Sequence, residues 1–239
     1  MKVLVIGGMH GNETLGIEVV KLFKHNPVIG VDVLLANEQA IDGNCRFVEQ
    51  DLNRSFPGNS KSTKYESRRA AEILTQTKKY DVVLDFHNTY CPDNDCGFIG
   101  DTANDNLTDV AWLLGFDKVI VADYDCINKV ADNCLSVEVS LDSPLNNAKL
   151  WYERIAMLSR LEGFTATSNV KKYRFVYRVT NVDRDRLRLY SQNLTTFQPL
   201  SNELAEAMGV KSPAYPIFID DKFTPYNYGG LLNELSIDR

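Results

Sequence analysis

The sequence lacks several features that would assign the protein to a specialised class. It contains no run of about 18 apolar residues, so a transmembrane helix is not expected and no membrane partner is predicted. Asp and Glu outnumber Lys and Arg by 32 to 26, and no basic stripe is visible, which argues against nucleic acid as a partner. No internal repeat or low-complexity segment interrupts the 239 residues. A globular chain with a sizeable core is therefore expected.

Cysteine is present, but its arrangement is neither a disulfide framework nor a paired metal motif. The five cysteines are odd in number, and none forms a Cys-x-x-Cys pair. This usage favours reduced thiols in the cytoplasm. Cys91 and Cys96 could still form a bridge, but only in an oxidising compartment. The N-terminus begins directly as a predicted strand, without the longer apolar region of a signal peptide, which also favours a cytoplasmic location.

Hydrophobic periodicity predicts an α/β fold over the first two thirds of the chain. Strands are expected at 2–8, 31–36, 81–86, 118–122 and 135–139, and helices at 12–25, 64–78, 103–114 and 147–162. This alternation favours a mostly parallel mixed sheet that is flanked by helices. Beyond about residue 165 the pattern becomes strand-like, with a further strand at 215–219. We therefore expect a main domain over 1–164 and a small, mainly β module over 165–239.

Histidine is scarce, and two of the three histidines lie where predicted strands end. His10 and Glu13 follow the first strand in Gly7-Gly8-Met9-His10-Gly11-Asn12-Glu13, and His87 follows the third strand. Because the carboxyl ends of strands line the ligand crevice of an open α/β sheet, these three side chains are expected to meet. Two imidazoles and one carboxylate leave a fourth coordination position free, which is the pattern of catalytic zinc. The ligand types alone do not distinguish zinc from other divalent ions.

Each of these residues also has an ordinary structural explanation. His10 alone could be a polar residue at a strand end, and Glu13 alone could be a first-turn carboxylate that the helix dipole stabilises. The glycines around His10 could also form a phosphate-binding turn. Their spacing is not G-x-G-x-x-G, however, and no P-loop lysine follows. The combination of three ligand types is what favours a metal site.

Two further groups of polar residues have the chemistry of a substrate site. Arg46, Asn53 and Arg54 lie in an irregular segment, and a guanidinium pairs bidentately with a carboxylate. The alternative is a solvated loop with surface ion pairs. Glu138 lies within the apolar strand Leu135–Val139, where a carboxylate is costly unless it is paired or functional. It is therefore a candidate general base, and the alternative is a solvent-facing glutamate on an edge strand.

Four segments, in this order, resemble the motifs of the aspartoacylase and succinylglutamate desuccinylase family of the zinc carboxypeptidase clan. They are Gly8-Met9-His10-Gly11-Asn12-Glu13, Asp51-Leu52-Asn53-Arg54-Ser55-Phe56, Asp85-Phe86-His87-Asn88-Thr89 and Val137-Glu138-Val139. The resemblance is close from residue 1 to about 140 and loose in the tail, and the His-Asn-Thr triplet is more similar to aspartoacylase. It implies a zinc carboxypeptidase-like hydrolase domain over 1–164 and a C-terminal module over 165–239 that completes the site.

The resemblance also implies how the metal and the reaction centre are built. It implies one zinc ion per subunit, bound by His10, Glu13 and His87. It further implies that Glu138 is the catalytic acid and base, and that Arg46 polarises the scissile carbonyl.

The substrate-binding residues that the resemblance implies lie in three parts of the chain. Asn53 and Arg54 match the pair that holds the substrate α-carboxylate, and Tyr124 falls at a substrate-contacting tyrosine. Tyr226, with Tyr228 as the alternative, is the candidate for the active-site tyrosine of the tail.

The sequence departs from the family pattern where the distal end of an aspartate substrate would bind. The family has an arginine ten residues before its catalytic glutamate, and this chain has Asn128 there, with Lys129 beside it. Specificity for aspartate therefore does not follow from the resemblance, and Lys129 is the candidate replacement cation.

The resulting hypothesis is a zinc-dependent amidohydrolase that cleaves a small N-acyl amino acid into a carboxylate, such as acetate, and a free amino acid. Two alternatives remain open: a small zinc carboxypeptidase that acts on peptides, and a metal-binding homologue without turnover. The sequence leaves open the acyl group, the amino acid and whether the chain forms a homo-oligomer.

Overall fold

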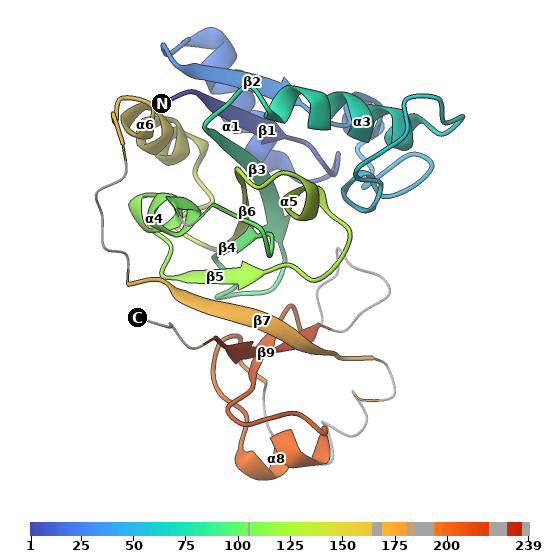
Figure 1. Ribbon diagram of the computed structural model, residues 1–239, viewed down its shortest axis with the longest axis vertical. Helices are drawn as coiled ribbons and strands as arrows, with labels where there is room; N and C mark the ends of the chain where they lie inside the picture. Colours follow the sequence, from blue (N-terminus) through green and yellow to red (C-terminus); the bar gives the residue numbers. More distant parts are fainter. Residues whose placement is uncertain (105, 164–168, 181–182, 184–193, 220–228, 236–239) are drawn as a thin grey trace.

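A single mixed sheet organises the computed structural model, which describes residues 1–104, 106–163, 169–180, 183, 194–219 and 229–235. Its strand order is β2-β1-β3-β6-β4-β5-β7-β9-β8, and helices lie against both faces (Figure 1). The strands are β1 (Val3–Gly7), β2 (Val31–Leu35), β3 (Val82–Thr89), β4 (Cys96–Ile99), β5 (Lys118–Val121), β6 (Cys134–Ser140), β7 (Lys171–Arg178), β8 (Tyr215–Ile217) and β9 (Gly230–Glu234).

The described helices differ in length, and the longest of them were predicted from their periodicity. They are α1 (Thr14–His25), α2 (Glu38–Asp42), η1 (Leu52–Arg54), α3 (Tyr65–Thr77), α4 (Asn106–Leu113), α5 (Ile127–Val130), α6 (Ala148–Leu158) and α8 (Asn202–Ala207). The segment expected to be irregular between the second strand and the next helix contains α2 and the 3-10 helix η1.

Strand pairing is parallel in one half of the sheet and mixed in the other. β1 pairs in parallel with β2 and β3, and β3 pairs in parallel with β6. β4 runs antiparallel to β6, and β9 runs antiparallel to both β7 and β8. The prediction of a mostly parallel mixed sheet flanked by helices is confirmed. The short strand β4 was not predicted, because four residues carry too little periodicity to reveal a strand.

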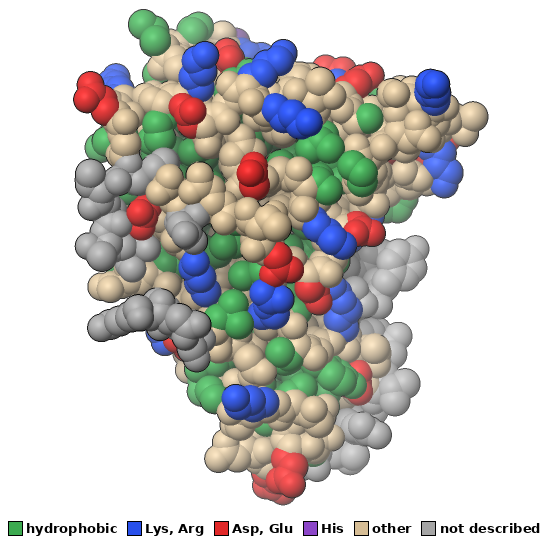
Figure 2. Space-filling view, in the orientation of Figure 1, with side chains coloured by type: hydrophobic (Ala, Val, Ile, Leu, Met, Phe, Trp, Pro, Cys, Tyr) green, Lys and Arg blue, Asp and Glu red, His purple; other side chains and the backbone are tan. Residues whose placement is uncertain are grey.

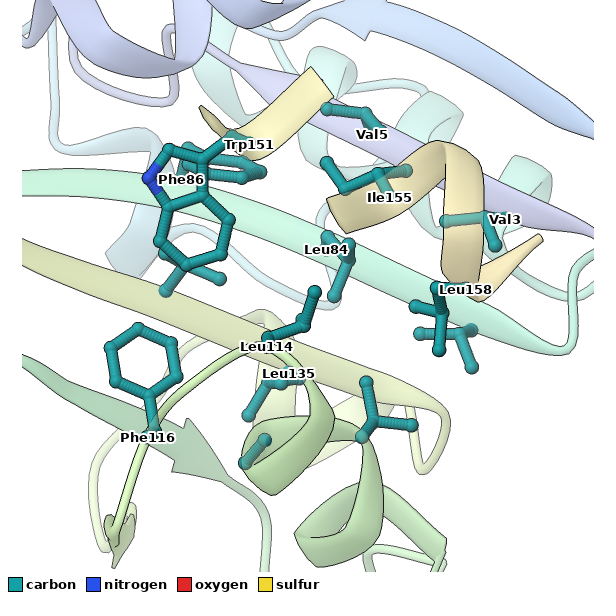
Figure 3. Close-up of a cluster of buried hydrophobic side chains, with 14 of the residues drawn as sticks. Val3, Val5, Leu84, Phe86, Leu114, Phe116, Leu135, Trp151, Ile155 and Leu158 are labelled. Atoms are coloured by element: carbon teal, nitrogen blue, oxygen red, sulfur yellow. The ribbon is translucent and has the colours of Figure 1, made fainter. Parts of the chain in front are cut away.

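Apolar side chains fix the sheet between two layers of helices. On one face, Trp151 of α6 meets the Phe86 ring edge-on, with the ring centres 5.1 Å apart, and Phe116 lies beside them (Figure 3). Side chains of α1, α4 and α6 share this core with those of the strands. On the opposite face, Ile73 of α3 and Ile127 of α5 belong to a second core with alternate residues of the strands. This double coverage explains why the central strands read as nearly continuous apolar runs.

Close packing between β1 and α1 positions the first candidate metal ligands. A Cβ atom on Gly7 would lie 2.2 Å from the carbonyl oxygen of Gly16, so only glycine permits this approach. Gly8 then turns the chain with φ of 72°, a conformation that favours glycine. The loop from His10 to Glu13 is thereby held at the carboxyl end of β1, as expected for a ligand loop in an α/β sheet.

The residues expected to form a separate C-terminal module extend the same sheet. β7 pairs in parallel with β5, with Lys118 opposite Lys171, and its final residues run past the end of β5. The hydrogen bonds between β5 and β7 therefore join strands from the two expected regions in one sheet, and the division into 1–164 and 165–239 stays a prediction. Tyr226 and Tyr228 lie outside the described residues.

The surface carries charged side chains of both signs. Lys and Arg lie among Asp and Glu on the face shown in Figure 2. Among the described helices, none combines the length and the apolar character needed to cross a bilayer.

The cysteines are free thiols. Cys91 and Cys96, which could have formed a bridge, are both buried and unbridged. Burial raises the pKa of the Cys96 thiol well above its ordinary value, and the negative charge of Glu138 acts in the same direction. Cys96 therefore behaves as a small core residue rather than as a reactive thiolate.

Candidate metal centre and substrate pocket

His10, Glu13 and His87 converge at the carboxyl ends of β1 and β3. All three are buried, and one ligand atom from each lies within 4.8 Å of the other two. The Nδ1 atom of His10 lies 2.7 Å from Glu13 Oε1, and the Nδ1 atom of His87 lies 3.0 Å from Glu13 Oε2. The two imidazoles, one from the loop after β1 and one from β3, thus face the same carboxylate. His87 does not end its strand, since the pairing of β3 with β6 continues to Thr89.

Glu13 is at the N-cap of α1, but its side chain does not cap the helix. Its Oε2 accepts a hydrogen bond from the backbone N–H of Asn88 at 3.2 Å, and its Oε1 accepts one from Arg46 Nη1 at 3.2 Å. Burial alone would raise the pKa of Glu13, but the charges and hydrogen bonds of His10 and His87 outweigh burial and hold this pKa well below its ordinary value. Glu13 is therefore an ionised carboxylate turned towards the histidines.

Each imidazole is also held from behind by a second carboxylate. The Nε2 atom of His10 lies 3.1 Å from Asp51 Oδ1, and the Nε2 atom of His87 lies 2.9 Å from Asp85 Oδ2. Burial lowers the pKa of His87, but the charges of Asp85 and Glu13 outweigh it and raise this pKa well above its ordinary value. Histidines that bind metals commonly have such carboxylate partners, which fix the ring orientation and the tautomer.

The donor set fits a divalent metal of the zinc type. Two Nδ1 atoms and one carboxylate are presented together, while the Nε2 atoms are engaged by the outer carboxylates. Asp51 and Asp85 were not predicted as partners of the histidines. The strand period does give a signal for Asp85, because residues two apart share one face of a strand and Asp85 precedes His87 by two.

Arg46 lies at the edge of the three candidate ligands. Besides its bond to Glu13, its guanidinium donates to Asp51 Oδ2 from Nε at 3.4 Å and from Nη2 at 3.3 Å. Burial raises the pKa of Asp51, but its hydrogen bond with His10 and the nearby positive charges outweigh burial and hold this pKa well below its ordinary value. The guanidinium is thus held beside the position where a metal would bind.

Asn53 and Arg54 differ in how far their side chains are already engaged. Asn53 is buried; its Oδ1 accepts from the backbone N–H of Ile127 at 3.3 Å, and its Nδ2 lies 3.5 Å from His87 Nε2. Arg54 is exposed, and its guanidinium carbon lies 4.3 Å from the centre of the Tyr124 ring. Among the described residues, no carboxylate forms an ion pair with Arg54. Its guanidinium is therefore available to an incoming carboxylate.

Glu138 lies on a central strand rather than on an edge strand. It is opposite His87 on β3 and opposite Cys96 on β4. Its side chain is half-buried and lines the same pocket as the candidate metal ligands. The alternative of a solvent-facing edge glutamate is therefore wrong, and the carboxylate lies beside a candidate metal ligand.

One pocket brings together most of the residues singled out in the sequence. The described lining includes His10, Glu13, Arg46, Asn53, Arg54, His87, Tyr124 and Glu138. Lys129 is not part of this lining. Its side chain is 54% exposed and forms an ion pair with Asp125 at 2.9 Å. Tyr226 is among the residues that the structure does not describe.

The pocket also contains residues that the sequence did not single out, namely Asn88, Phe98, Ser136, Phe175, Arg178, Phe218 and Gly229. Arg178 ends β7, where alternating charged residues resemble those of a solvent-facing strand. Ring stacking could not be anticipated either: Phe98 stacks on Phe218 at 5.9 Å and on Phe175 at 6.4 Å between ring centres. These contacts join elements that are far apart in the chain.

Asn128 lines the pocket, but both ends of its amide are used within the fold. Its Nδ2 donates to the carbonyl oxygens of Phe98 and Cys134 at 3.0 and 3.1 Å. Its Oδ1 accepts from the Ser136 hydroxyl at 2.8 Å, and that hydroxyl also lies 3.2 Å from Asp85 Oδ2. Asn128 therefore belongs to the polar network behind His87.

Comparisons with known proteins agree with this geometry. Residues 1–99 match the family model described as the succinylglutamate desuccinylase/aspartoacylase catalytic domain. An N-acyl-aromatic-L-amino acid amidohydrolase (carboxylate-forming) from Xenopus tropicalis is 36% identical over 104 residues, which cover 37% of this chain and 34% of the relative. A probable aspartoacylase from Trichodesmium erythraeum is 33% identical over 156 residues, which cover 59% of this chain and 46% of the relative.

Solved structures extend the likeness of the fold over the whole chain. A succinylglutamate desuccinylase from Chromobacterium violaceum has a TM-score of 0.74 at 17% identity, and covers 100% of this chain and 86% of its own. Murine aminoacylase 3 has a TM-score of 0.69 at 18% identity, with 98% and 95% covered. The sequence matches span about a third to a half of the curated relatives. Residues 1–99, which carry the candidate metal ligands, are therefore similar to the catalytic domain of the succinylglutamate desuccinylase/aspartoacylase family, and the fold of the whole chain is similar to these solved structures.

Proposed function

We propose that the protein is a zinc-dependent amidohydrolase that cleaves the amide bond of a small N-acyl amino acid. The observation that carries the proposal is the single pocket in which three buried metal-type ligands lie beside Glu138, Arg46 and Arg54. Relatives named as amidohydrolases and aspartoacylases support the same class of reaction. The products would be a carboxylate, such as acetate, and the free amino acid.

In this proposal, the inner ligands and their outer carboxylates hold the metal. His10, Glu13 and His87 would bind zinc, while Asp51 and Asp85 keep the imidazoles oriented. Zinc bound there would supply Lewis acidity, making water a better nucleophile and polarising the amide carbonyl.

The protein's own residues would perform the proton transfer and stabilise the charge. Glu138 accepts a proton from the attacking water as the oxygen bonds to the acyl carbon, and it delivers a proton to the amine nitrogen as the C–N bond breaks. Arg46 donates hydrogen bonds to the carbonyl oxygen as negative charge develops on it. A donor of this kind is typically worth roughly 3–4 kcal/mol of transition-state stabilisation.

Substrate positioning would use the exposed side of the pocket. Arg54, which has no carboxylate partner among the described residues, would pair with the substrate α-carboxylate, and the Asn53 side chain would lie beside it. We further propose that the C-terminal residues complete the site, since Phe175 and Arg178 of β7 and Phe218, directly after β8, line the pocket.

A hydrolysis panel on zinc-loaded protein tests this proposal. The substrates are N-acetyl and N-succinyl derivatives of several amino acids, with dipeptides as the competing class. We expect release of free amino acid from the N-acyl compounds and loss of that release after chelation of the metal. Full activity of metal-free protein, or cleavage of dipeptides alone, would overturn the proposed reaction.

A further inference from the structure

We infer that Arg178 is a specificity-determining residue that binds a second anionic group of the substrate, in addition to the α-carboxylate. The inference rests on the proposed function, because it concerns the substrate of the same pocket. The second anion is a carboxylate, and it could belong to the amino-acid side chain or to a dicarboxylic acyl group. A guanidinium is suited to either, because it pairs bidentately with carboxylates.

Two guanidiniums converge on one aromatic ring in this pocket. The Arg54 guanidinium carbon lies 4.3 Å from the centre of the Tyr124 ring, and that of Arg178 lies 5.4 Å from the same centre. Both arginines line the pocket. Two cations held against one ring are within reach of a single small molecule that carries two carboxylates. A monoanionic substrate would use only one of them.

The aromatic side chains hold Arg178 at the pocket. Besides its contact with Tyr124, its guanidinium carbon lies 5.4 Å from the centre of the Phe175 ring. Such stacking favours a guanidinium over other cations and reduces its mobility. Arg178 reaches Tyr124 because β7 runs past the end of β5. The C-terminal third of the chain therefore contributes this contact to the pocket.

The present partner of Arg178 is a carboxylate that a substrate could replace. Arg178 Nη2 lies 3.0 Å from Asp123 Oδ1, and the two side chains are 43% and 40% exposed. Ion pairs this exposed contribute little to stability. Exchange of the Asp123 carboxylate for a substrate carboxylate is therefore expected to cost little.

The other candidates for this role have different partners. Asn128 uses its whole amide within the fold, so its donors are not available to a substrate. Lys129 is paired with Asp125 on the surface and does not line the pocket. Arg46 is held by Glu13 and Asp51. Among the described lining residues, Arg178 is thus the cation beyond Arg54 that Glu13 and Asp51 do not hold.

The test measures ligand binding and hydrolysis separately. Binding is measured by calorimetry on zinc-loaded Glu138→Gln protein, in which turnover is expected to be slow, with and without Arg178→Gln. The ligands are N-acetyl-L-aspartate, N-succinyl-L-alanine and the monoanion N-acetyl-L-alanine. Arg174→Gln is the matched control, because Arg174 is on the same strand and pairs with Asp101 at a similar exposure, 45% and 55%.

We expect Arg178→Gln to weaken binding of at least one dianion by tenfold or more and to change binding of the monoanion by less than twofold. The dianion that is affected identifies the source of the second carboxylate. Arg174→Gln is expected to leave all three affinities unchanged. Equal losses for monoanion and dianions, no binding of either dianion, or a larger effect of Lys129→Gln would each overturn the inference.

Hydrolysis by the wild-type protein separates this inference from the proposed function. Turnover of N-acetyl-L-alanine with no preference for a dianion would leave the proposed function in place and overturn the role of Arg178. Conversely, dianion binding that depends on Arg178, without hydrolysis of any N-acyl amino acid, would support the inference and contradict the proposed reaction.

Discussion

Replacement of Asp85 by asparagine is expected to weaken zinc binding without removing any of the three candidate ligands. Asp85 is fully buried, and its Oδ2 lies 2.9 Å from His87 Nε2 and 3.2 Å from the Ser136 hydroxyl. Asparagine keeps the shape but loses the charge that orients the ring. A hydrogen bond to a charged group is worth about 1.5–3 kcal/mol. Since about 1.4 kcal/mol corresponds to a factor of ten, zinc affinity should fall by about 10- to 100-fold.

Competition with a chromophoric chelator measures this zinc affinity directly. Asp125→Asn provides the same chemical change at an exposed aspartate outside the pocket lining, and should leave the affinity unchanged. Thermal unfolding of both variants reports whether the buried substitution has damaged the fold. If Asp85→Asn remains folded and binds zinc as tightly as the wild type, the assignment of Asp85 as the outer partner of His87 is wrong.

Three further outcomes are expected. Trp151→Ala should lower the free energy of unfolding by about 3–5 kcal/mol in urea titrations, because it leaves a cavity beside Phe86. A loss below about 1 kcal/mol would contradict that packing. Gly7→Ala should lower the free energy of unfolding by about 1–3 kcal/mol, because the added Cβ would meet the Gly16 backbone. Unchanged stability would refute this contact. Zinc binding should release protons, and zinc affinity should rise as pH rises through the raised pKa of His87, because the metal requires the neutral imidazole. Calorimetry in buffers of different ionisation enthalpy measures the protons released, and no release would refute this expectation.

The sequence was most informative where local pattern and chemistry coincide. The helix α6 has a clear helical period and the strand β1 is a short continuous apolar run, so both were predicted to within a few residues. Glu138 was conspicuous because a carboxylate interrupts an apolar strand, and the structure locates it opposite His87. In these places one short segment contains all the residues on which the prediction depends.

Features that depend on distant contacts were not predictable in this way. Arg178 shares the alternating pattern of a solvent-facing strand. Its contact with Tyr124 arises because β7 pairs with β5 over Lys171–Arg174 and then continues past the end of β5. Asn128 and Lys129 are neighbours in sequence, yet tertiary packing directs the Asn128 side chain to the buried polar network and leaves the Lys129 side chain on the surface. Side-chain direction at such sites is decided by the assembled fold rather than by local sequence.

The most direct test of the central claim is hydrolysis of N-acyl amino acids by the zinc-loaded Glu138→Gln protein, with metal content measured on the same sample. The account predicts one zinc ion per chain in both the variant and the wild type, and a rate that falls by about 10²- to 10⁴-fold in the variant. Glu153→Gln, on the exposed side of α6, is the matched control and should retain the wild-type rate. A Glu138→Gln protein that binds zinc and hydrolyses substrate at the wild-type rate would contradict the account.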